Sequence, residues 1–549
     1  MRFKQSLTKQ LLPGIIWAAV AAVPVLFVAI FFGWPVVSLI MRGLADPQTA
    51  LEIALSSDTV KVLGQTLMQA TAGTVVSVLA GIPVGYALYR VNFRGVTALR
   101  ALITVPFVMP TVVVAVSFNS LYGESGALYW LGLDQSFTLL VMAFAFFNIT
   151  VVARSVGTLW ERLDTRPADA ARMLGAGPVR VFLTITLPAL RPAIAAASAL
   201  VFLFCATSFG IVLILGGRRF ANLETAIYRN TVQLLDLQTA AVLAILQTIL
   251  VVLSLVVAQR IRSRSEQRQL VQKPAARLGR SNWLPVAVTI LIMLLQAMPL
   301  FSLLWRSLHR DGRFTLQNYA DLAVTHKTLN GSVLDAAFTS LKFAVIATLL
   351  TVVISAIAAI VASRRPTSPL LRRGLSLFDG LLMLPVGVSA VTLGSGLLLT
   401  MHRPFGIDID LRTDTALIFI AQALVAMPIV MRILLPSLRA IDQRSKDAAA
   451  VLGASPLRVM LDIELPQLGR ALGIALGFAF AAALGEFGAS SFLVRPGATT
   501  LPVIISYLAA KPGSSEYGSA LAAAVLLGAI TAAVMLAAER IRPKQRGEW

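Results

Sequence analysis

Long apolar runs limit what this chain can fold into more than any other feature. Twelve stretches of about 20 mostly apolar residues occur along its 549 residues, and about 20 is the length that a helix needs to cross a bilayer. Only 13% of the residues are charged, against about a quarter in soluble proteins. An all-α polytopic membrane protein is therefore predicted. The expected spans are 15–40, 66–89, 101–121, 138–158, 193–215, 239–258, 283–305, 339–361, 377–400, 415–436, 471–494 and 518–538.

Basic residues indicate the direction of these spans. With the N-terminus inside, the loops on the cytoplasmic side hold 31 of the 47 Lys and Arg residues and the outer loops hold 13. Because Lys and Arg stay in cytoplasmic loops, both termini are predicted to be cytoplasmic, in a cell (inner or plasma) membrane. The first run is longer than the core of about 7–15 residues in a signal peptide, so we expect it to be a retained span. The formal charge of +21 needs no nucleic-acid partner, because no basic domain is present.

The chain contains an internal repeat at an offset of 278 residues. The segment Asp169–Pro188 aligns with Asp447–Pro466, and thirteen of the twenty positions are identical. Each copy falls between the fourth and fifth spans of one half, which predicts two parallel six-helix repeats. The predicted divisions are 1–60 (tail, first span, external loop), 61–258 (first transmembrane domain), 259–282 (cytoplasmic linker), 283–338 (seventh span, external loop), 339–540 (second transmembrane domain) and 541–549 (cytoplasmic tail).

Each repeated segment predicts a helix, a turn and a second helix in a cytoplasmic loop. Pro167 suits the first turn, Asp169 places negative charge near the positive helix end, and Gly175 supplies a left-handed residue that ends the helix. A second helix is expected from Pro178 to Pro188. The second copy offers Asp442 as N-cap, Gly453, Pro456 and Pro466 in the same roles.

Apolar residues of these loops suggest a contact surface. Leu174, Val181 and Leu187, like Leu452, Val459 and Leu465, would be only partly covered by neighbouring spans. A single loop of this kind also suits a hairpin that packs under the helix bundle. Two copies with the same small residues favour docking against a partner that has two equivalent sites.

The motif Asp-Ala-Ala, three residues, Gly, and a stretch that ends in Leu-Pro resembles the cytoplasmic signature of type I ABC importer permeases, in which Glu usually replaces Asp. The resemblance implies that each loop is a coupling helix seated on one of two copies of an ATPase subunit. It also implies an extracytoplasmic solute-binding protein. The implied coupling residues are Asp169, Ala170, Ala171, Gly175, Leu187, Pro188, Asp447, Ala448, Ala449, Gly453, Leu465 and Pro466.

Two further segments narrow the resemblance. Leu215–Tyr228 and Gly485–Tyr507, in a chain that joins both halves, look most like the permeases of thiamine and ferric-iron importers. The first segment favours thiamine, and ferric iron is the alternative.

Catalytic and metal motifs are missing from the sequence. No Gly-Lys dipeptide occurs, so a P-loop is excluded and ATP hydrolysis must come from a partner rather than from this chain. Cys205 is the single cysteine, and the three histidines, His309, His326 and His402, fall in predicted external loops. We therefore predict no catalytic residue, no metal site and no cofactor.

Glu486 is a carboxylate inside an apolar run, and its repeat equivalent is Ser208. A charge at this depth is costly unless it faces a polar cavity or a partner, so both are candidate pore or gate residues. The alternative is that Glu486 lies near the outer interface and is solvated.

Two other classes of protein remain as rivals. An ion-driven secondary transporter also uses two parallel halves, but it predicts several buried carboxylates within the spans. A membrane-embedded enzyme or scaffold predicts a cluster of catalytic side chains, and the sequence offers none. Alternating access, with the halves moved by ATP-hydrolysing partners, is the expected mechanism.

Overall fold

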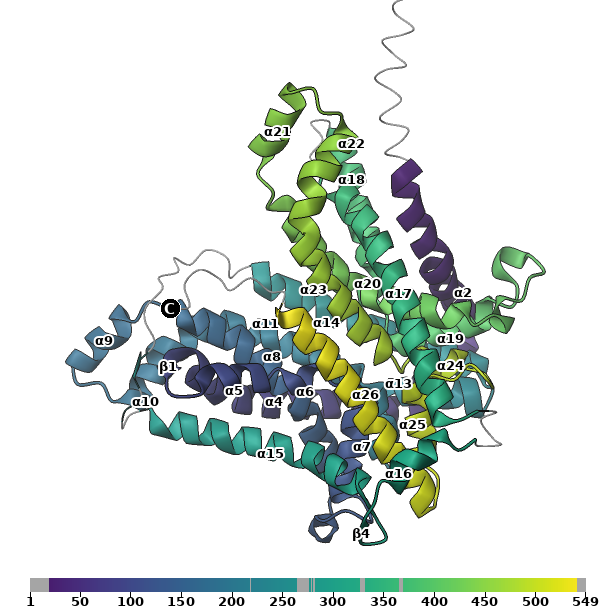
Figure 1. Cartoon of the computed structure of the whole chain (residues 1–549), viewed down its shortest axis with the longest axis horizontal. Helices are drawn as coiled ribbons and strands as arrows, with labels where there is room; N and C mark the ends of the chain where they lie inside the picture. Colours follow the sequence, from purple (N-terminus) through teal and green to yellow (C-terminus); the bar gives the residue numbers. More distant parts are fainter. Residues whose placement is uncertain are drawn as a thin grey trace, which may run out of the picture. The chain divides into compact units, whose positions relative to one another are not determined.

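The computed structural model describes residues 19–217, 219–263, 276–277, 279, 282–325, 331–364 and 369–540. The predicted tails before residue 19 and after residue 540, most of the predicted linker and His326 lie outside the described residues. The described part is almost entirely helical (Figure 1). Its strands are β1 (Val91–Asn92), parallel to β2 (Ala276–Arg277), and β3 (His309–Arg310), antiparallel to β4 (Arg313–Phe314).

The number of spans agrees with the sequence. Nine helices of the described residues are long and apolar enough to cross a membrane, and three bent helix pairs raise the number to twelve if each pair is one span. Every predicted span coincides with one of these. The all-α class with twelve spans is thus confirmed, although several predicted boundaries differ from the helix ends by up to fifteen residues, as at Pro178.

The chain divides into two compact units. The first comprises Met1–Ala45, Ala323–Ile504 and Leu527–Trp549, and the second Asp46–Leu322 and Ile505–Leu526. The second unit contains α3 (Pro47–Leu55), α4 (Ser57–Arg90), α5 (Val96–Leu102), α6 (Val105–Val108), α7 (Thr111–Tyr122), α8 (Phe137–Glu161), α9 (Arg166–Met173), α10 (Pro178–Val181), α11 (Leu187–Ala206), α12 (Phe209–Leu215), α13 (Leu223–Tyr228), α14 (Leu237–Ser263), α15 (Trp283–Ser307) and α16 (Gln317–Ala320).

The first unit has the corresponding order of elements. It contains α2 (Trp34–Gly43), α17 (Val333–Ala362), α18 (Pro369–Met383), α19 (Ala390–Thr400), α20 (Ala416–Arg439), α21 (Gln443–Val451), α22 (Pro456–Val459), α23 (Leu465–Leu484) and α24 (Ser490–Leu493). The last two helices, α25 (Leu501–Ala509) and α26 (Ser514–Arg540), contribute residues to both units.

The first span of each half packs with the other half. In the second unit, α15 lies against α7, where the Ser120 hydroxyl donates a hydrogen bond of 3.0 Å to Ser302. Gln296 of α15 also donates to the carbonyl of Phe146 in α8 at 3.0 Å. In the first unit, α2 packs so closely on α19 that a Cβ added to Gly396 would lie 3.2 Å from the Cβ of Pro35. The first span of the first half (α2) thus packs with the second half, and the first span of the second half (α15) packs with the first half. The repeat in the sequence does not reveal this exchange.

Two spans are sharply bent at equivalent positions. The pair Val96–Val108 and Thr111–Tyr122 bends by 99°, and the pair Arg372–Gly387 and Ala390–Gly406 bends by 97°. Pro110, which precedes α7, has no N–H to continue the helix and adopts an extended ψ of 139°. Val388, its equivalent 278 residues later, is also extended, with ψ 140°. The halves therefore share these breaks although only one of the two positions holds proline.

The predicted end of the second loop helix is wrong in both copies. Helix α10 continues through a π-helical turn (Phe182–Thr186) into α11, and Pro178–Ala206 forms one helix. The Leu187 amide donates to the Phe182 carbonyl five residues earlier, so the wider turn accommodates Pro188, which has no N–H. The same turn precedes Pro466, where the Leu465 amide donates to the Met460 carbonyl.

Candidate functional site

The first loop forms the short helix α9 between two long ones. Pro167 lies in its first turn, as predicted. Gly175 has φ +84°, and the amide of Ala176 bonds to the carbonyl of Ala171 at 3.0 Å. This is a Schellman motif, which satisfies carbonyls at the helix end and needs a left-handed residue. The prediction that Gly175 ends the helix is confirmed.

The second loop repeats this geometry. Gly453 also has φ +84°, and the Ala454 amide bonds to Ala449 at 3.0 Å. Asp442 precedes α21 and accepts a hydrogen bond of 2.9 Å from the Arg444 amide, as expected of an N-cap. Its repeat equivalent, Asp164, accepts one of 3.0 Å from Arg166.

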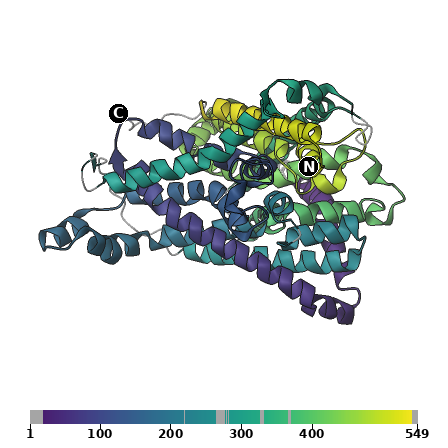
Figure 2. The ribbon, with the colours of Figure 1, turned by 90° about the horizontal axis from the view of Figure 1, so that it is seen from below.

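Both loops expose apolar side chains. Met173 and Leu174 are each 89% exposed, and their equivalents Val451 and Leu452 are each 87% exposed. Val181 differs from the expectation, because it is only 2% exposed. Figures 1 and 2 show α9 and α10, drawn in blue, extending past the end of α15. An apolar surface of this kind on an extended hairpin marks a contact site.

Small and charged residues surround this apolar surface in the same pattern in each copy. Asp169, Ala170, Asp447 and Ala448 are exposed, whereas Ala171 and Ala449 are half-buried. Asp169 pairs with Arg172 one turn on at 3.0 Å, and Asp447 accepts a hydrogen bond of 3.0 Å from Gln443. No atom within 4 Å would meet a Cβ added at Gly175 or Gly453, so both glycines face open space.

Ser208 and Glu486 both follow the end of a span. Helix α11 ends at Ala206 and α23 at Leu484, which are equivalent positions. Glu486 is only 6% exposed, so the solvated alternative is wrong. Its carboxylate accepts hydrogen bonds from the amides of Ala489 (2.7 Å) and Ser490 (2.9 Å), and from the Ser490 hydroxyl. The group thus stabilises the turn that leads into α24.

Ser208 is only 8% exposed, and its carbonyl accepts a hydrogen bond of 2.9 Å from the Asn222 side chain. The pathway role of both residues stays a prediction.

Sequence reasoning missed two buried carboxylates, Glu224 and Glu464. Glu224 is fully buried in α13 and accepts a hydrogen bond of 2.6 Å from Gln247 of α14. Glu464 is 1% exposed and lies 2.8 Å from the Lys446 ammonium. Glu464 lies between Ile463 and Leu465, which was the signal in the sequence that could have found it, whereas Glu224 is followed by the polar Thr225.

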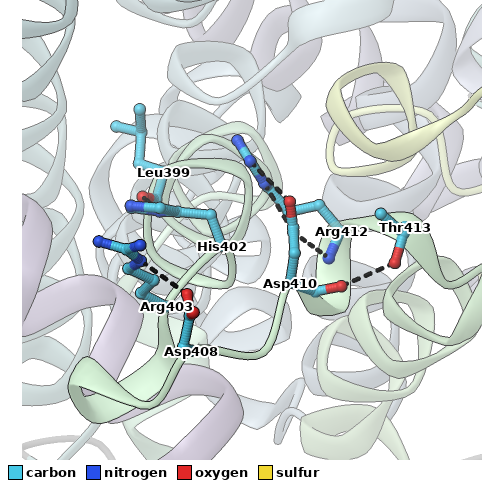
Figure 3. Close-up of polar contacts among 7 residues, drawn as sticks. All are labelled: Leu399, His402, Arg403, Asp408, Asp410, Arg412 and Thr413. Carbon is cyan, nitrogen blue, oxygen red and sulfur yellow. Dashed lines mark hydrogen bonds and ion pairs between the residues drawn. The ribbon is translucent and has the colours of Figure 1, made fainter.

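A polar loop connects α19 with α20 (Figure 3). Arg412 holds Asp410 through two nitrogens at 2.9 and 2.8 Å, and Arg403 contacts Asp408 at 3.1 Å. The hydrogen bond from the Arg412 side chain is the main reason that the pKa of Asp410 falls to about 2. The His402 ring nitrogen Nδ1 is 2.9 Å from the Leu399 carbonyl. Within the described ranges, no three His, Cys, Asp or Glu side chains gather where they could hold a metal ion.

These features define a class of protein. Apolar helical spans in two repeated halves, each with an exposed loop between its fourth and fifth spans, are those of a polytopic membrane protein built from two equivalent halves.

Comparison with known proteins specifies the family. Residues 77–268 match the model of the binding-protein-dependent transport system inner membrane component. The thiamine transport system permease protein ThiP of Brucella abortus is 27% identical over 86% of each chain, and that of Escherichia coli is 28% identical over 85% of each. A probable ABC transporter permease protein, y4fN, of Sinorhizobium fredii is 24% identical over 91% of each. Residues 77–268 are thus similar to the membrane component of binding-protein-dependent transport systems, and most of the chain is similar to permease proteins of ABC transporters.

One solved structure shows a partial likeness. It is the crystal structure of a bacterial ABC transporter involved in the import of the acidic polysaccharide alginate. It is 18% identical, with a TM-score of 0.37, and the match covers 48% of this chain and 96% of that chain.

Proposed function

We propose that this permease imports thiamine. The observation that carries the proposal is the match, over 85–86% of both chains, to permeases named for thiamine transport in several bacteria. A match of that coverage extends over both halves of the chain. Ferric iron is the alternative within the same family.

The proposed partners are two copies of an ABC ATPase subunit and one solute-binding protein. The exposed apolar residues of the two loops support the ATPase contact, because Leu174 and Leu452 are 89% and 87% exposed at equivalent positions. The sequence has no P-loop lysine, so the energy of ATP must enter through such contacts. Under this proposal the chain is not itself an enzyme, and it carries no cofactor.

The proposed orientation has both termini and both coupling loops in the cytoplasm. The distribution of Lys and Arg supports it, with 31 in the inner loops and 13 in the outer ones. The loop that contains Asp410 then faces the binding protein. The six predicted divisions, from 1–60 to 541–549, remain our proposal for the domain organisation.

In the proposed mechanism, ATP binding brings the two ATPase subunits together, and each one pulls its coupling loop. The halves then move as rigid bodies and open the pathway to the docked binding protein, and hydrolysis returns the pathway to the inward-facing state. We place Ser208 and Glu486 beside this pathway. Hydrogen bonds from the amides of Ala489 and Ser490 hold the Glu486 side chain in a fixed position beside it.

Reconstitution tests the proposed substrate. The permease is co-expressed with its ATPase subunit, placed in proteoliposomes and supplied with purified binding protein, and ATP hydrolysis and uptake are measured with thiamine or ferric iron. Thiamine should stimulate both activities and iron neither. Stimulation by iron alone would assign the permease to the iron branch. Uptake of solute without any ATPase subunit would overturn the ABC mechanism itself.

A further inference from the structure

A buried ion pair connects the second coupling loop to the helix bundle. Glu464, 1% exposed, lies in the π-helical turn that begins α23, and its Oε1 accepts a hydrogen bond of 2.8 Å from the Lys446 ammonium of α21. Its Oε2 is 3.6 Å from the Arg364 guanidinium, just beyond the end of α17. Lys446, Glu464 and Arg364, which we call the ion-pair anchor, therefore join the loop to two spans.

A cavity lies beside this anchor. Its volume is about 740 Å³, and residues of the loop form one side, including Asp442, Gln443 and Asp447, while Ser363 and Leu438 at the ends of α17 and α20 form another. Lys446 and Arg364 both line it. Helix α21 is thus separated from the ends of α17 and α20 along this side, and the anchor spans the gap that side-chain packing leaves open.

The first coupling loop is attached by different chemistry. Positions 168 and 186, which correspond to Lys446 and Glu464, hold alanine and threonine, so this ion pair cannot form there. Instead Trp160 contacts two other aromatic rings. Its centroid is 5.0 Å from that of Tyr86 in α4 and 5.9 Å from that of Phe182 at the start of the fifth span. In the second half, Leu438 and Met460 occupy the positions of Trp160 and Phe182.

We infer that the ion-pair anchor positions the second coupling loop and passes its movement to α23 and α17, so the two loops are coupled to the bundle unequally. The inference rests on the proposed contact with an ATPase subunit. A buried pair is weakly screened by salt and holds its partners at short range. Glu464 pairs with cations from two elements, Lys446 of α21 and Arg364 at the end of α17. Displacement of α21 therefore moves Glu464 at the start of α23 and, through Arg364, the end of α17. The aromatic contacts of the first loop are less directional and connect only neighbouring helices.

Neutralising one charge tests this role. In the complete complex, Glu464→Gln should keep the ATPase subunits bound but lower the stimulation of ATP hydrolysis by loaded binding protein about five- to tenfold, as loss of coupling between sites does. Asp462→Asn is the matched control, because Asp462 is exposed in the same turn and the charge change is identical. It should leave stimulation unchanged.

Variants of Lys446 separate positioning from general stability. Lys446→Arg keeps the cation and should retain stimulation, whereas Lys446→Gln should lose stimulation by no more than Glu464→Gln does, because the pair of Glu464 with Arg364 remains. The double variant Lys446→Gln with Glu464→Gln should be no worse than Glu464→Gln alone, because that variant already removes both ion pairs. Additive losses, or an equal loss in Lys446→Arg, would contradict the inference.

Spin labels give a reading that does not depend on the ATPase. Cys205 is the only cysteine and is buried, so in a Cys205→Ala background a label can be placed at Arg444→Cys or at the equivalent Arg166→Cys, both exposed. Glu464→Gln should increase label mobility at 444 and leave 166 unchanged. No change at 444 would overturn the inference. If the unsubstituted complex shows no stimulated ATPase activity, the proposed function fails, and the labels still decide on the anchor.

Discussion

Gly175 and Gly453 lie 278 residues apart and have the same backbone φ of +84°. Each follows a short exposed helix, and in each case the next alanine amide bonds back to an alanine carbonyl five residues earlier at 3.0 Å. The duplicated loops therefore agree in backbone geometry and not only in sequence. Because both glycines face open space, their conformation rather than crowding explains why glycine stands there.

The first prediction concerns this left-handed conformation. Gly175→Ser and Gly453→Ser should each cost about 1 kcal/mol, because a side chain makes the left-handed region unfavourable. We expect the helix end to shift, and stimulated ATPase activity of the complex to fall while the spans remain folded. Gly177→Ser is the control, since Gly177 has φ −66° and its repeat equivalent is already Ser455. A loss of activity in the control equal to that in Gly175→Ser would contradict this account.

The second prediction concerns Glu486. Its carboxylate accepts hydrogen bonds from two buried amides, so Glu486→Ala should leave donors unpaired and cost about 1–3 kcal/mol of stability. The melting temperature of the detergent-purified permease, followed by loss of the monodisperse peak in gel filtration, measures this. Ser491→Ala should have little effect, because the Ser491 hydroxyl bonds only to the Gly488 carbonyl in its own turn.

Glu486→Gln separates the structural role from the pathway role. The amide keeps one oxygen acceptor and leaves one backbone amide unpaired, so Glu486→Gln should cost less stability than Glu486→Ala, whereas the carboxylate is lost. If Glu486 also attracts a cationic solute, the KM for thiamine uptake should rise with little change in kcat. An unchanged KM would limit Glu486 to supporting the turn before α24.

The repeat and the apolar runs allowed much of the fold to be predicted from the sequence. The helix ends at 175 and 453 need a left-handed residue, which glycine supplies independently of the rest of the fold, so local rules were sufficient there. The end of the second helix at Pro188 was predicted wrongly, because the rule treats proline as a helix end. A π-helical turn instead supplies the extra residue, so the Leu187 amide bonds to Phe182 and the helix continues.

Features that depend on long-range contacts could not be predicted from the sequence. Packing of Gln296 against the Phe146 carbonyl, which places the seventh span with the first half, depends on which surfaces meet and leaves no local pattern. The pair Lys446–Glu464 spans eighteen residues across a turn, and its importance comes from burial that only the fold creates. Glu486 was found because a carboxylate in an apolar run is conspicuous, but its hydrogen-bond partners became visible only with the turn.

The third prediction concerns pH. Asp410 has a pKa lowered to about 2, first because the Arg412 side chain bonds to it. A carboxyl group whose pKa is lower in the folded state than in the unfolded state stabilises the fold at pH values above its unfolded pKa of about 3.9. That contribution is lost as the pH falls towards 2. Affinity of the binding protein for the permease should therefore show no step from Asp410 between pH 4 and 7. Asp410→Asn should alter that affinity by the same factor at pH 4 and at pH 7. A factor that differs between the two pH values would contradict the lowered pKa of Asp410.

The fourth prediction separates ATP-driven from ion-driven transport through Glu224. This carboxylate is fully buried and accepts a hydrogen bond of 2.6 Å from Gln247, which a glutamine oxygen can also accept. In an ATP-driven importer Glu224→Gln should therefore keep most thiamine uptake, and a protonophore should have no effect at constant ATP. An ion-driven transporter that uses this group needs it to gain and lose a proton, so the variant would abolish uptake. Uptake into ATP-loaded vesicles, with and without protonophore, decides between the two.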